Sequence, residues 1–404
     1  MRIVAHRPDP GLVTLPWHLP LEEWEEPYVV PLPRGISRHV VRIVRAGEQV
    51  YAVKETQEPI AFREYRLLRD LRRLGLPAVT PSAVVTGRQD RAGDELPVAL
   101  VTQHLRFSLP YRSLFGQGAS ARGSELLETL VDALAVLLVR LHLSGFFWGD
   151  VSLSNVLFRR SAGDLAAYLV DAETGELHPS LSDGQRGHDL TLATENVFAE
   201  LLDLQAGDLL SPDADPHAVI GRIQDRYDAL WGELTGTEEF TTDEMWRIEQ
   251  RIARLNELGF DVAELDIVTD WDGSSVRIQP QVVEAGHHRR ELLGLTGMDL
   301  EDNQARRLLN DLAAYAAHHD LGGEDRGIVA GRWMTQVYEP IAAMVPPELR
   351  TRLEPAEVFH EILEHRWYLS ERAGHEVDIF EAARSYIESE LVRRPVEDPL
   401  PDSS

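Results

Sequence analysis

The sequence of 404 residues contains no cysteine. This absence excludes disulfide bonds, thiol catalysis, and zinc or iron–sulfur sites that use cysteine ligands. The sequence also lacks any apolar run close to the ~18 residues of a membrane-spanning helix. Its first residues, MRIVAH, lack the long apolar segment of a secretory signal peptide. We therefore expect a cytoplasmic protein with no membrane span.

Positive charge is scarce as well. The chain has 40 lysine and arginine residues against 67 aspartates and glutamates, which gives a formal net charge of -27. Nucleic acids bind basic surfaces, so this composition argues against nucleic acid as a general partner. A local site for a small anion is not excluded, because the nearby cations decide there. At ~150 residues per domain, the length indicates two or three domains.

Lysine is the rarest charged residue. Among the 40 basic side chains only Lys54 is a lysine, and it lies in the run VYAVKE at residues 50–55. A compact ammonium fits among phosphate oxygens and a buried carboxylate, where a planar guanidinium does not. A strand that ends in Ala-Val-Lys is also how a protein-kinase fold presents its nucleotide-anchoring lysine. The alternative is a bias toward arginine that left one lysine at a random position.

A helix is expected at residues 59–74, because the segment begins with a proline and is followed by a glycine. Glu64 lies on the apolar face of this helix, at helical spacing from several leucines. A carboxylate is costly to bury unless a cation meets it, and Lys54 is the obvious candidate. A surface glutamate at the edge of the apolar stripe is the alternative, and the sequence does not separate the two.

The strongest signal lies at residues 145–158, which read GFFWGDVSLSNVLF. Asp150, followed five residues later by Asn155 and then by an apolar strand, has the spacing of a kinase catalytic loop. An amphipathic helix is expected before the loop, at residues 125–143. This arrangement of polar residues is hard to explain by packing alone.

Two strands are expected after the loop, at residues 155–159 and 165–171, with a turn between them. A hairpin that closes near Gly163 brings Asn155 beside Asp171. These side chains offer two oxygen ligands of the kind that holds magnesium in kinases. Asp150 would then point at the hydroxyl group of an acceptor.

About residues 28–205 resemble the protein-kinase-like superfamily, and within it the atypical bacterial members related to lipopolysaccharide-core sugar kinases. The whole chain is similar to an actinobacterial family of uncharacterised kinase-like proteins that carry a C-terminal domain of unknown function. The resemblance implies a two-lobed fold with ATP and magnesium in the cleft. It implies Lys54 as the phosphate anchor, Glu64 as its partner, Asp150 as the catalytic base, Asn155 and Asp171 as metal ligands, and backbone groups near Gln103 to Leu105 as the contacts of adenine.

The loop that would cover the phosphates departs from the kinase pattern. It is expected at residues 33–39, where the chain reads PRGISRH and has one glycine rather than three. Cover must therefore come from Gly35, Ser37 and Arg38 or from backbone amides.

Two further departures lie in the second lobe. Trp148 and Gly149 replace the usual His-Arg before the catalytic aspartate, and Asp171-Ala172-Glu173 replaces Asp-Phe-Gly. The second change adds a carboxylate near the metals. The short stretch Thr174–Gly187 leaves little of the platform on which eukaryotic-type kinases dock a peptide.

We expect an α+β chain with a two-lobed protein-kinase-like fold. A small β-rich N-lobe (1–105) and a helical C-lobe with the catalytic loop (106–210) precede a mostly α-helical C-terminal domain (216–392) and a disordered tail (393–404). The C-terminal domain is expected to contain a β-hairpin with strands at 264–268 and 275–279. Its helices are expected at about 216–235, 241–259, 299–319, 325–344 and 354–391, the last with a break.

A basic cluster stands out in the acidic second half, where residues 284–291 read EAGHHRRE. The start of a helix with His287, His288, Arg289 and Arg290 could bind an anion, such as an acidic group on an acceptor. The alternative is a solvated helix end whose arginines pair with Glu284 and Glu291. The sequence favours neither.

Together these features predict an ATP- and Mg²⁺-dependent phosphotransferase that acts on a hydroxyl of a small-molecule or glycan-like acceptor. The alternative is a pseudokinase, a nucleotide-binding scaffold or regulator that transfers no phosphate. The presence of all five polar positions favours catalysis. The glycine-poor loop and the Asp-Ala-Glu sequence favour the scaffold.

Overall fold

The computed structural model describes residues 1–31, 39–116, 123–236, 238–241, 250, 260–269 and 275–398. The chain divides into two compact units. Unit 1 contains Met1–Arg159 and Ala167–Tyr227, and unit 2 contains Arg160–Ala166 and the described residues from Asp228 onward. This division falls within one helix, Pro216–Thr235, and so differs from the predicted boundary near residue 216, where that helix begins. The predicted limits of the lobes and of the C-terminal domain stay predictions.

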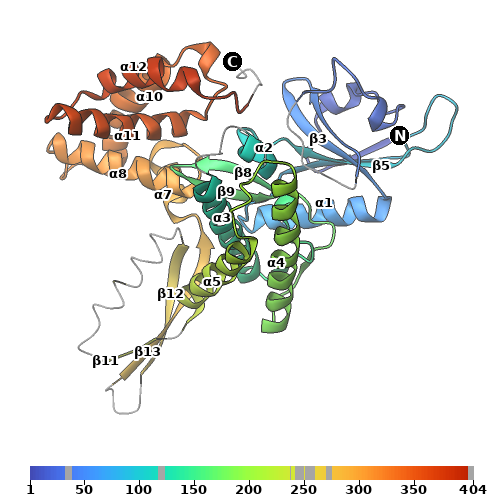
Figure 1. Ribbon diagram of the computed structural model, residues 1–404, viewed down its shortest axis with the longest axis horizontal. Helices are drawn as coiled ribbons and strands as arrows, with labels where there is room; N and C mark the ends of the chain where they lie inside the picture. Colours follow the sequence, from blue (N-terminus) through green and yellow to red (C-terminus); the bar gives the residue numbers. More distant parts are fainter. Residues whose placement is uncertain are drawn as a thin grey trace. The chain divides into compact units, whose positions relative to one another are not determined.

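Unit 1 begins with a five-stranded antiparallel sheet in the order β1-β4-β5-β3-β2. Its strands are β1 (Arg2–Ala5), β2 (Val41–Ala46), β3 (Gln49–Thr56), β4 (Pro81–Thr86) and β5 (Val98–Gln103). Helix α1 (Glu58–Arg73) lies along the sheet (Figure 1). Side chains of α1 such as Ala61 and Tyr65 pack with Leu100 of the sheet in one core cluster. Because successive side chains of a strand point to opposite faces, Tyr51 and Val53 of β3 pack in a different cluster.

The N-terminal segment packs with that second cluster through Trp17 and Trp24, and it contains two short 3-10 helices (Pro10–Thr14 and Leu21–Glu23). A fully buried arginine, Arg88, holds the segment in place. Its guanidinium donates to the carbonyl oxygens of Trp17 (3.2 Å) and Leu19 (2.6 Å) and pairs with Glu55 at 2.7 Å. These acceptors, with the carbonyl oxygen of Pro97 at 2.8 Å as a fourth, offset the cost of burying one charge.

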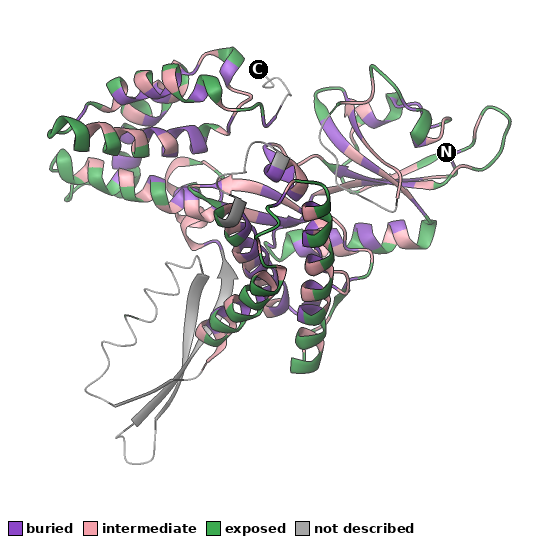
Figure 2. Ribbon diagram, viewed as in Figure 1, coloured by how far each residue is buried: buried purple, intermediate pink, exposed green. Residues whose placement is uncertain are grey.

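The rest of unit 1 is mostly helical. Its elements are β6 (Ser108–Pro110), α2 (Tyr111–Gly116), α3 (Gly123–Leu143), β7 (Phe146–Phe147), β8 (Val156–Ser161), β9 (Asp164–Leu169), β10 (Glu176–Leu177), α4 (Asp183–Ala206) and α5 (Pro216–Thr235), with the hairpin tip and the end of α5 grouped in unit 2. Strands β6, β8 and β9 form a three-stranded sheet. The helices and strands predicted before and after Asp150 are confirmed. Exposed and buried residues alternate along α4, as expected for an amphipathic surface helix (Figure 2).

Unit 2 contains a three-stranded sheet and a set of helices. The sheet has the order β11-β13-β12, from β11 (Glu238–Thr241), β12 (Phe260–Thr269) and β13 (Ser275–Ala285). The predicted hairpin is therefore confirmed with longer strands. Its predicted turn at 270–273, and the predicted helix at about 241–259 apart from residues 241 and 250, lie outside the described residues.

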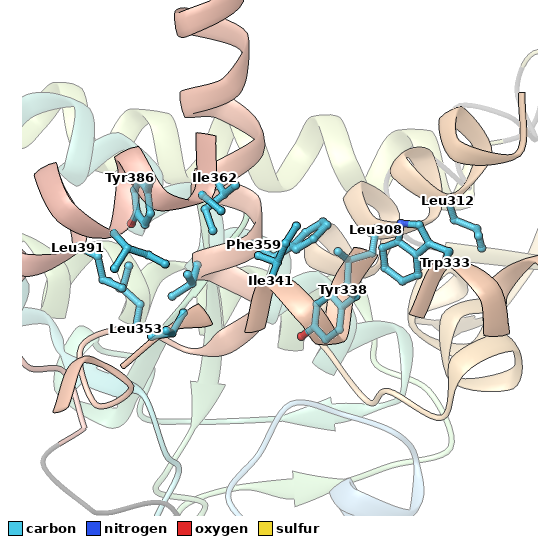
Figure 3. Packing of buried hydrophobic residues seen from close by; sticks show 14 of the residues in the cluster. Leu308, Leu312, Trp333, Tyr338, Ile341, Leu353, Phe359, Ile362, Tyr386 and Leu391 are labelled. Atoms are coloured by element: carbon cyan, nitrogen blue, oxygen red, sulfur yellow. The ribbon is translucent and has the colours of Figure 1, made fainter. Parts of the chain in front are cut away.

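The helices of unit 2 are α7 (His287–Thr296), α8 (Asp302–His318), α9 (Arg326–Trp333), α10 (Glu339–Met344), α11 (Pro355–Ala373) and α12 (Ile379–Ser389), with a π-helical turn at Met334–Tyr338. They share one core, in which the rings of Trp333 and Phe359 lie 5.9 Å apart and those of Tyr338 and Phe359 lie 5.2 Å apart (Figure 3). The chain thus has a mixed α and β fold, with a sheet at its N-terminal end and a mostly helical C-terminal part, as predicted.

Candidate functional site

Strand β3 ends in a lysine surrounded by carboxylates. The Nζ atom of Lys54 lies 2.8 Å from Asp171 Oδ2, 3.1 Å from Glu64 Oε2 and 3.2 Å from Glu173 Oε2. Glu64 reaches the lysine from α1 and is 1% exposed. The ion pair predicted between Lys54 and Glu64 is present, and the alternative of a surface glutamate is excluded.

The environment of this network shifts two pKa values. Burial raises the pKa of Glu64 to about 7, and the nearby charge of Asp171 adds to the rise, while Lys54 opposes it. For Lys54, burial by itself would lower the pKa, but the carboxylates of Glu64 and Asp171 raise it well above its usual value. The lysine therefore keeps its positive charge across the physiological pH range, and Glu64 changes charge near neutrality.

The loop before β8 brings Asp150 and Asn155 together. The Asn155 side-chain nitrogen donates to the backbone oxygen of Asp150 at 3.0 Å and to its carboxylate Oδ2 at 3.1 Å. The Ser152 hydroxyl accepts the backbone N–H of Asn155 and caps a short 3-10 turn. Because the amide nitrogen of Asn155 faces Asp150, its amide oxygen is the atom left to bind a cation.

The base of the β8–β9 hairpin brings Asn155 close to Asp171. The backbone N–H of Val170 donates to the Asn155 carbonyl oxygen at 3.1 Å, one residue before Asp171. Asp171 Oδ1 accepts the backbone N–H of Glu173 at 2.9 Å, which fixes the direction of the carboxylate. The predicted closeness of Asn155 and Asp171 is confirmed, and their role as metal ligands stays a prediction.

A cavity of about 560 Å³ joins these groups. Its apolar walls include Ala52, Leu100 and Leu157, and its polar lining includes Lys54, Glu64, Asn155 and Asp171. Gln103, His104 and Leu105, at the end of β5, also line it. An apolar slot with a few convergent polar groups is typical of a site for a small ligand.

Two backbone N–H groups of the segment predicted to bind adenine already donate hydrogen bonds within the protein. The N–H of Gln103 donates to the Thr80 carbonyl at 2.8 Å, and the N–H of His104 donates to the Val50 carbonyl at 2.9 Å. Gln103, His104 and Leu105 still line the cavity. A purine would therefore have to meet other backbone groups of this segment.

Two site residues were not found by sequence reasoning in their present roles. His39 Nε2 lies 3.0 Å from Glu173 Oε2, so an imidazole extends the network around Lys54. Glu173 was expected only as an extra carboxylate near the metals, and the structure pairs it with the lysine. Gly35, Ser37 and Arg38, predicted to cover the phosphates, lie outside the described residues.

Helix α4 supports the whole length of the catalytic loop. Asp189 accepts the backbone N–H groups of Trp148 (2.7 Å) and Gly149 (2.8 Å). Asn196 donates to the carbonyl oxygen of Val151 at 2.9 Å. Asn196 lies seven positions after Asp189, and Glu200 lies four positions after Asn196. This spacing places the three side chains on one face of the helix.

Glu200 completes this support at the far end of the loop. Its carboxylate accepts the backbone N–H groups of Leu153 and Ser154, each at 2.8 Å, and the Ser154 hydroxyl. Burial raises the pKa of Glu200 despite these hydrogen bonds, which lower it. The polar positions 196 and 200, at helical spacing from Asp189, are the signal that could have revealed the rest of this face in the sequence.

The basic cluster of unit 2 is already engaged with carboxylates. His288 Nδ1 lies 2.9 Å from Asp302 Oδ2, and an Arg289 guanidinium nitrogen lies 2.8 Å from Asp299 Oδ2. The partners expected for a solvated helix end were Glu284 and Glu291, but Glu291 pairs with Arg326, and the side chain of Glu284 lies outside the described residues. An anion bound by His287, His288, Arg289 and Arg290 would have to displace Asp299 and Asp302, so this site stays a prediction.

Comparison with known families accounts for most of the chain. Residues 42–197 match the lipopolysaccharide kinase (Kdo/WaaP) family. The chain carries a kinase-like domain. The matched range contains all five predicted site residues of the cavity and its loop, namely Lys54, Glu64, Asp150, Asn155 and Asp171. Residues 229–391 match a domain of unknown function, DUF4032. The predicted combination of a kinase-like domain and an uncharacterised C-terminal domain is confirmed.

No curated protein matches the sequence. A solved structure described as "WaaP in complex with acyl carrier protein" is 17% identical, and the match covers 57% of this chain and 100% of that chain with a TM-score of 0.31. A score this low carries no weight for fold or function. Within the part of the chain that the structure describes, no helix combines the length and apolarity needed to cross a membrane.

Proposed function

We propose that this kinase-like chain transfers the γ-phosphoryl group of ATP to a hydroxyl of a small-molecule or glycan-like acceptor. The observation that carries the proposal is the convergence on one cavity of the only lysine, its buried glutamate partner, and the pair Asn155 and Asp171. A structural ion pair alone needs no such cavity. An apolar slot that ends at a fixed ammonium suits a nucleotide with its phosphates at the charged end.

The donor set fits a magnesium ion. Asn155 offers an amide oxygen and Asp171 a carboxylate, which are hard oxygen ligands of the kind that Mg²⁺ prefers, and both line the cavity. When bound there, magnesium would neutralise charge on the phosphate oxygens. Glu64 is too deeply buried, and too close to Lys54, to be a first choice as a ligand.

The residues of the chain supply the remaining chemistry. The acceptor oxygen forms a bond to the γ-phosphorus, the bond to the β–γ bridging oxygen breaks, and ADP leaves. Asp150 receives the proton of the hydroxyl. The hydrogen bond that Asn155 donates to the Asp150 carboxylate fixes the orientation of this carboxylate. Lys54 places its ammonium against the phosphates, and Glu64 keeps the lysine extended into the cavity.

The segment after the predicted metal ligand supports a small acceptor. Strand β10 begins at Glu176 and helix α4 begins at Asp183, so only a short stretch separates Asp171 from the next helix. This stretch is too short to form the extended platform on which kinases dock a peptide. A compact hydroxylated acceptor is therefore the better match.

One observation favours a pseudokinase as the second candidate. Glu173 pairs with both Lys54 and His39, which places a carboxylate where phosphate oxygens are needed. Nucleotide binding requires Glu173 to leave this position. A chain in which Glu173 never leaves would be a scaffold without transfer.

Two substitutions separate these functions. Asp150→Asn should abolish transfer, by at least about 100-fold, and leave ATP affinity nearly unchanged, because the base acts on the acceptor. Asp171→Asn should instead weaken Mg²⁺-dependent binding of ATP. Calorimetric titration of both variants with ATP, with and without magnesium, measures the binding, and release of labelled phosphate measures the turnover.

A screen identifies the acceptor. Wild-type protein and Asp150→Asn are incubated with γ-labelled ATP and a cell extract, and the products are compared by mass spectrometry. The proposal expects a labelled small molecule that appears only with the wild type. Label on defined Ser, Thr or Tyr residues of proteins would contradict the acceptor class, and no label above the level of the variant would favour the pseudokinase.

A further inference from the structure

A buried chain of hydrogen bonds leads from helix α5 to the catalytic loop. The Tyr227 hydroxyl oxygen lies 2.7 Å from His142 Nδ1, and His142 Nε2 lies 3.2 Å from Asp189 Oδ2. Asp189 in turn accepts the backbone N–H groups of Trp148 and Gly149, directly before Asp150. Tyr227 and Asp189 are 0% exposed and His142 is 2% exposed. Because these side chains are buried from solvent, each depends on its hydrogen-bond partners within the protein.

The partners indicate the tautomer of the imidazole. Asp189 is an acceptor for two backbone N–H groups, so His142 Nε2 must carry the hydrogen that it shares with this carboxylate. In a neutral ring, Nδ1 then has a lone pair, and the Tyr227 hydroxyl donates to it. A guanidinium nitrogen of Arg186 lies 3.4 Å from the same hydroxyl oxygen and donates to it. With a neutral ring, these partners set the direction of the hydrogen bonds from Tyr227 through His142 to Asp189.

Without the hydroxyl, the ring loses this constraint. Nδ1 would be left buried without its donor, and rotation of the ring to relieve this would take the Nε2 hydrogen away from Asp189. With that donor lost, Asp189 would hold the N–H groups of Trp148 and Gly149 less firmly. Gly149 has a φ of 75°, a left-handed conformation that favours glycine, and these N–H groups hold the turn. Asp150 follows this turn immediately and would lose its fixed position.

Helix α5 is itself anchored, so Tyr227 has a defined place. Arg222 of α5 pairs with Asp132 at 3.0 Å and with Glu128 at 3.1 Å, both on α3, the helix that also carries His142. Ile223, which lies between Arg222 and Tyr227 in the sequence, is fully buried. Figure 1 shows α5 beside α3. The distance from Tyr227 to His142 is therefore set by helix packing.

We propose that Tyr227 and His142 are positioning residues for phosphoryl transfer, acting through Asp189 on the loop that carries Asp150. This inference rests on the proposed function of the same site. Tyr227 lies outside both matched family ranges, 42–197 and 229–391. A residue from the segment between the two domains thus completes the support of the catalytic loop.

The test uses the full chain and two readouts. Tyr227→Phe removes the hydroxyl and keeps the ring, so we expect the fold to persist. Hydrogen exchange of peptides that cover residues 146–155 should become faster by about tenfold, because Asp189 holds the N–H groups of Trp148 and Gly149 less firmly. Hydrolysis of Mg·ATP, with water as the probe acceptor, should fall about tenfold in kcat with KM unchanged, because the lysine end of the site is untouched.

A matched control comes from unit 2. Tyr386 is buried and its hydroxyl bonds to Glu361, so Tyr386→Phe removes a comparable hydrogen bond in the other unit. This variant should change neither readout for the loop. A change of the same size in Tyr386→Phe would show that Tyr227→Phe acts only through general loss of stability, and would overturn the inference.

Substitutions of the histidine separate positioning from packing. His142→Gln keeps an N–H donor for Asp189 and an acceptor for Tyr227, so loop protection should stay within about threefold of wild type. His142→Leu keeps the volume and removes the donor, so exchange of the loop should rise as in Tyr227→Phe. Equal protection in the glutamine and leucine variants would overturn the inference. If the wild type neither binds nor hydrolyses ATP, the proposed function fails, and the exchange measurements still decide the role of Tyr227 in holding the loop.

Discussion

Glu64 makes the stability of the fold depend on pH. Burial raises its pKa to about 7 in the folded protein, against an ordinary value of 4.5. Between these values the folded state holds a proton that the unfolded state has lost, so this residue's contribution to stability falls as the pH rises through the window. Below pH 4.5 the contribution is fully present, and above pH 7 it is lost.

Glu64→Gln removes this dependence. The free energy of unfolding of the wild type minus that of the variant should decrease by about 1–3 kcal/mol between pH 4.5 and pH 8. Denaturant titrations of both proteins at several pH values, without nucleotide, measure this difference. A difference that stays constant or increases with pH would show that Glu64 is ionised throughout.

Single residues also show what the sequence could and could not reveal. Lys54 and Glu64 were predictable as a pair, because one scarce residue type stood on a strand and one carboxylate stood on an apolar helix face. The contact of Glu173 with Lys54 and His39 was not, since it depends on how the backbone turns after Asp171. The same holds for Arg88, whose acceptors are backbone oxygens distant in sequence.

At the scale of elements, helix α4 is the support of the catalytic loop. Glu200 accepts two backbone N–H groups and a hydroxyl from Leu153 and Ser154. In Glu200→Gln one of the two acceptor oxygens becomes an NH₂ group that faces a donor, so we expect a loss of about 1–3 kcal/mol in stability. Turnover of Mg·ATP should fall too, because the loop that ends at Asn155 loses its anchor.

Glu195 on the same helix is the matched control, because it is exposed. Thermal unfolding and phosphate release are measured for Glu200→Gln and Glu195→Gln side by side. The control should behave as the wild type. Wild-type stability and turnover in Glu200→Gln would show that the loop keeps its conformation without α4.

Long periodic elements were predictable and short ones were not. Helices α3, α4, α5, α8 and α11 follow from the spacing of their apolar residues. Strand β1 has only four residues and exists because it pairs with β4, and the 3-10 turns near Trp17 exist because they pack on the sheet. Such elements depend on contacts with distant residues, which a local pattern does not contain.

At the scale of the whole molecule, the division into two compact units falls within helix α5 and not in the turn-rich segment. The predicted break at 207–216 separates α4 from α5, yet residues up to Tyr227 group with the kinase-like unit. The reason is physical: Ile223 and Tyr227 of α5 are fully buried, and Tyr227 bonds to His142. A polar, turn-rich segment indicates where a chain bends, and burial decides to which unit the next helix belongs.

The β8–β9 hairpin is also divided between the two units. Its tip, Arg160–Ala166, groups with unit 2, where the N–H of Ala162 donates to Glu357 at 2.9 Å and Arg160 pairs with Glu397 at 2.6 Å. Glu357 and Glu397 are buried. No sequence pattern linked Ala162 with Glu357 or Arg160 with Glu397, because the partners lie 195 and 237 residues apart in the sequence.

The central claim is that Lys54 holds the phosphates of ATP, and one measurement tests it most directly. An ATP-derived acyl-phosphate probe reacts with amines at a nucleotide site, and Lys54 is the only lysine in the chain. The account predicts labelling of the Lys54 peptide that excess Mg·ATP prevents, and an affinity of Lys54→Arg for Mg·ATP that is about tenfold weaker or more, equal to about 1.4 kcal/mol. Labelling that Mg·ATP does not reduce, together with equal affinity in Lys54→Arg, would contradict it.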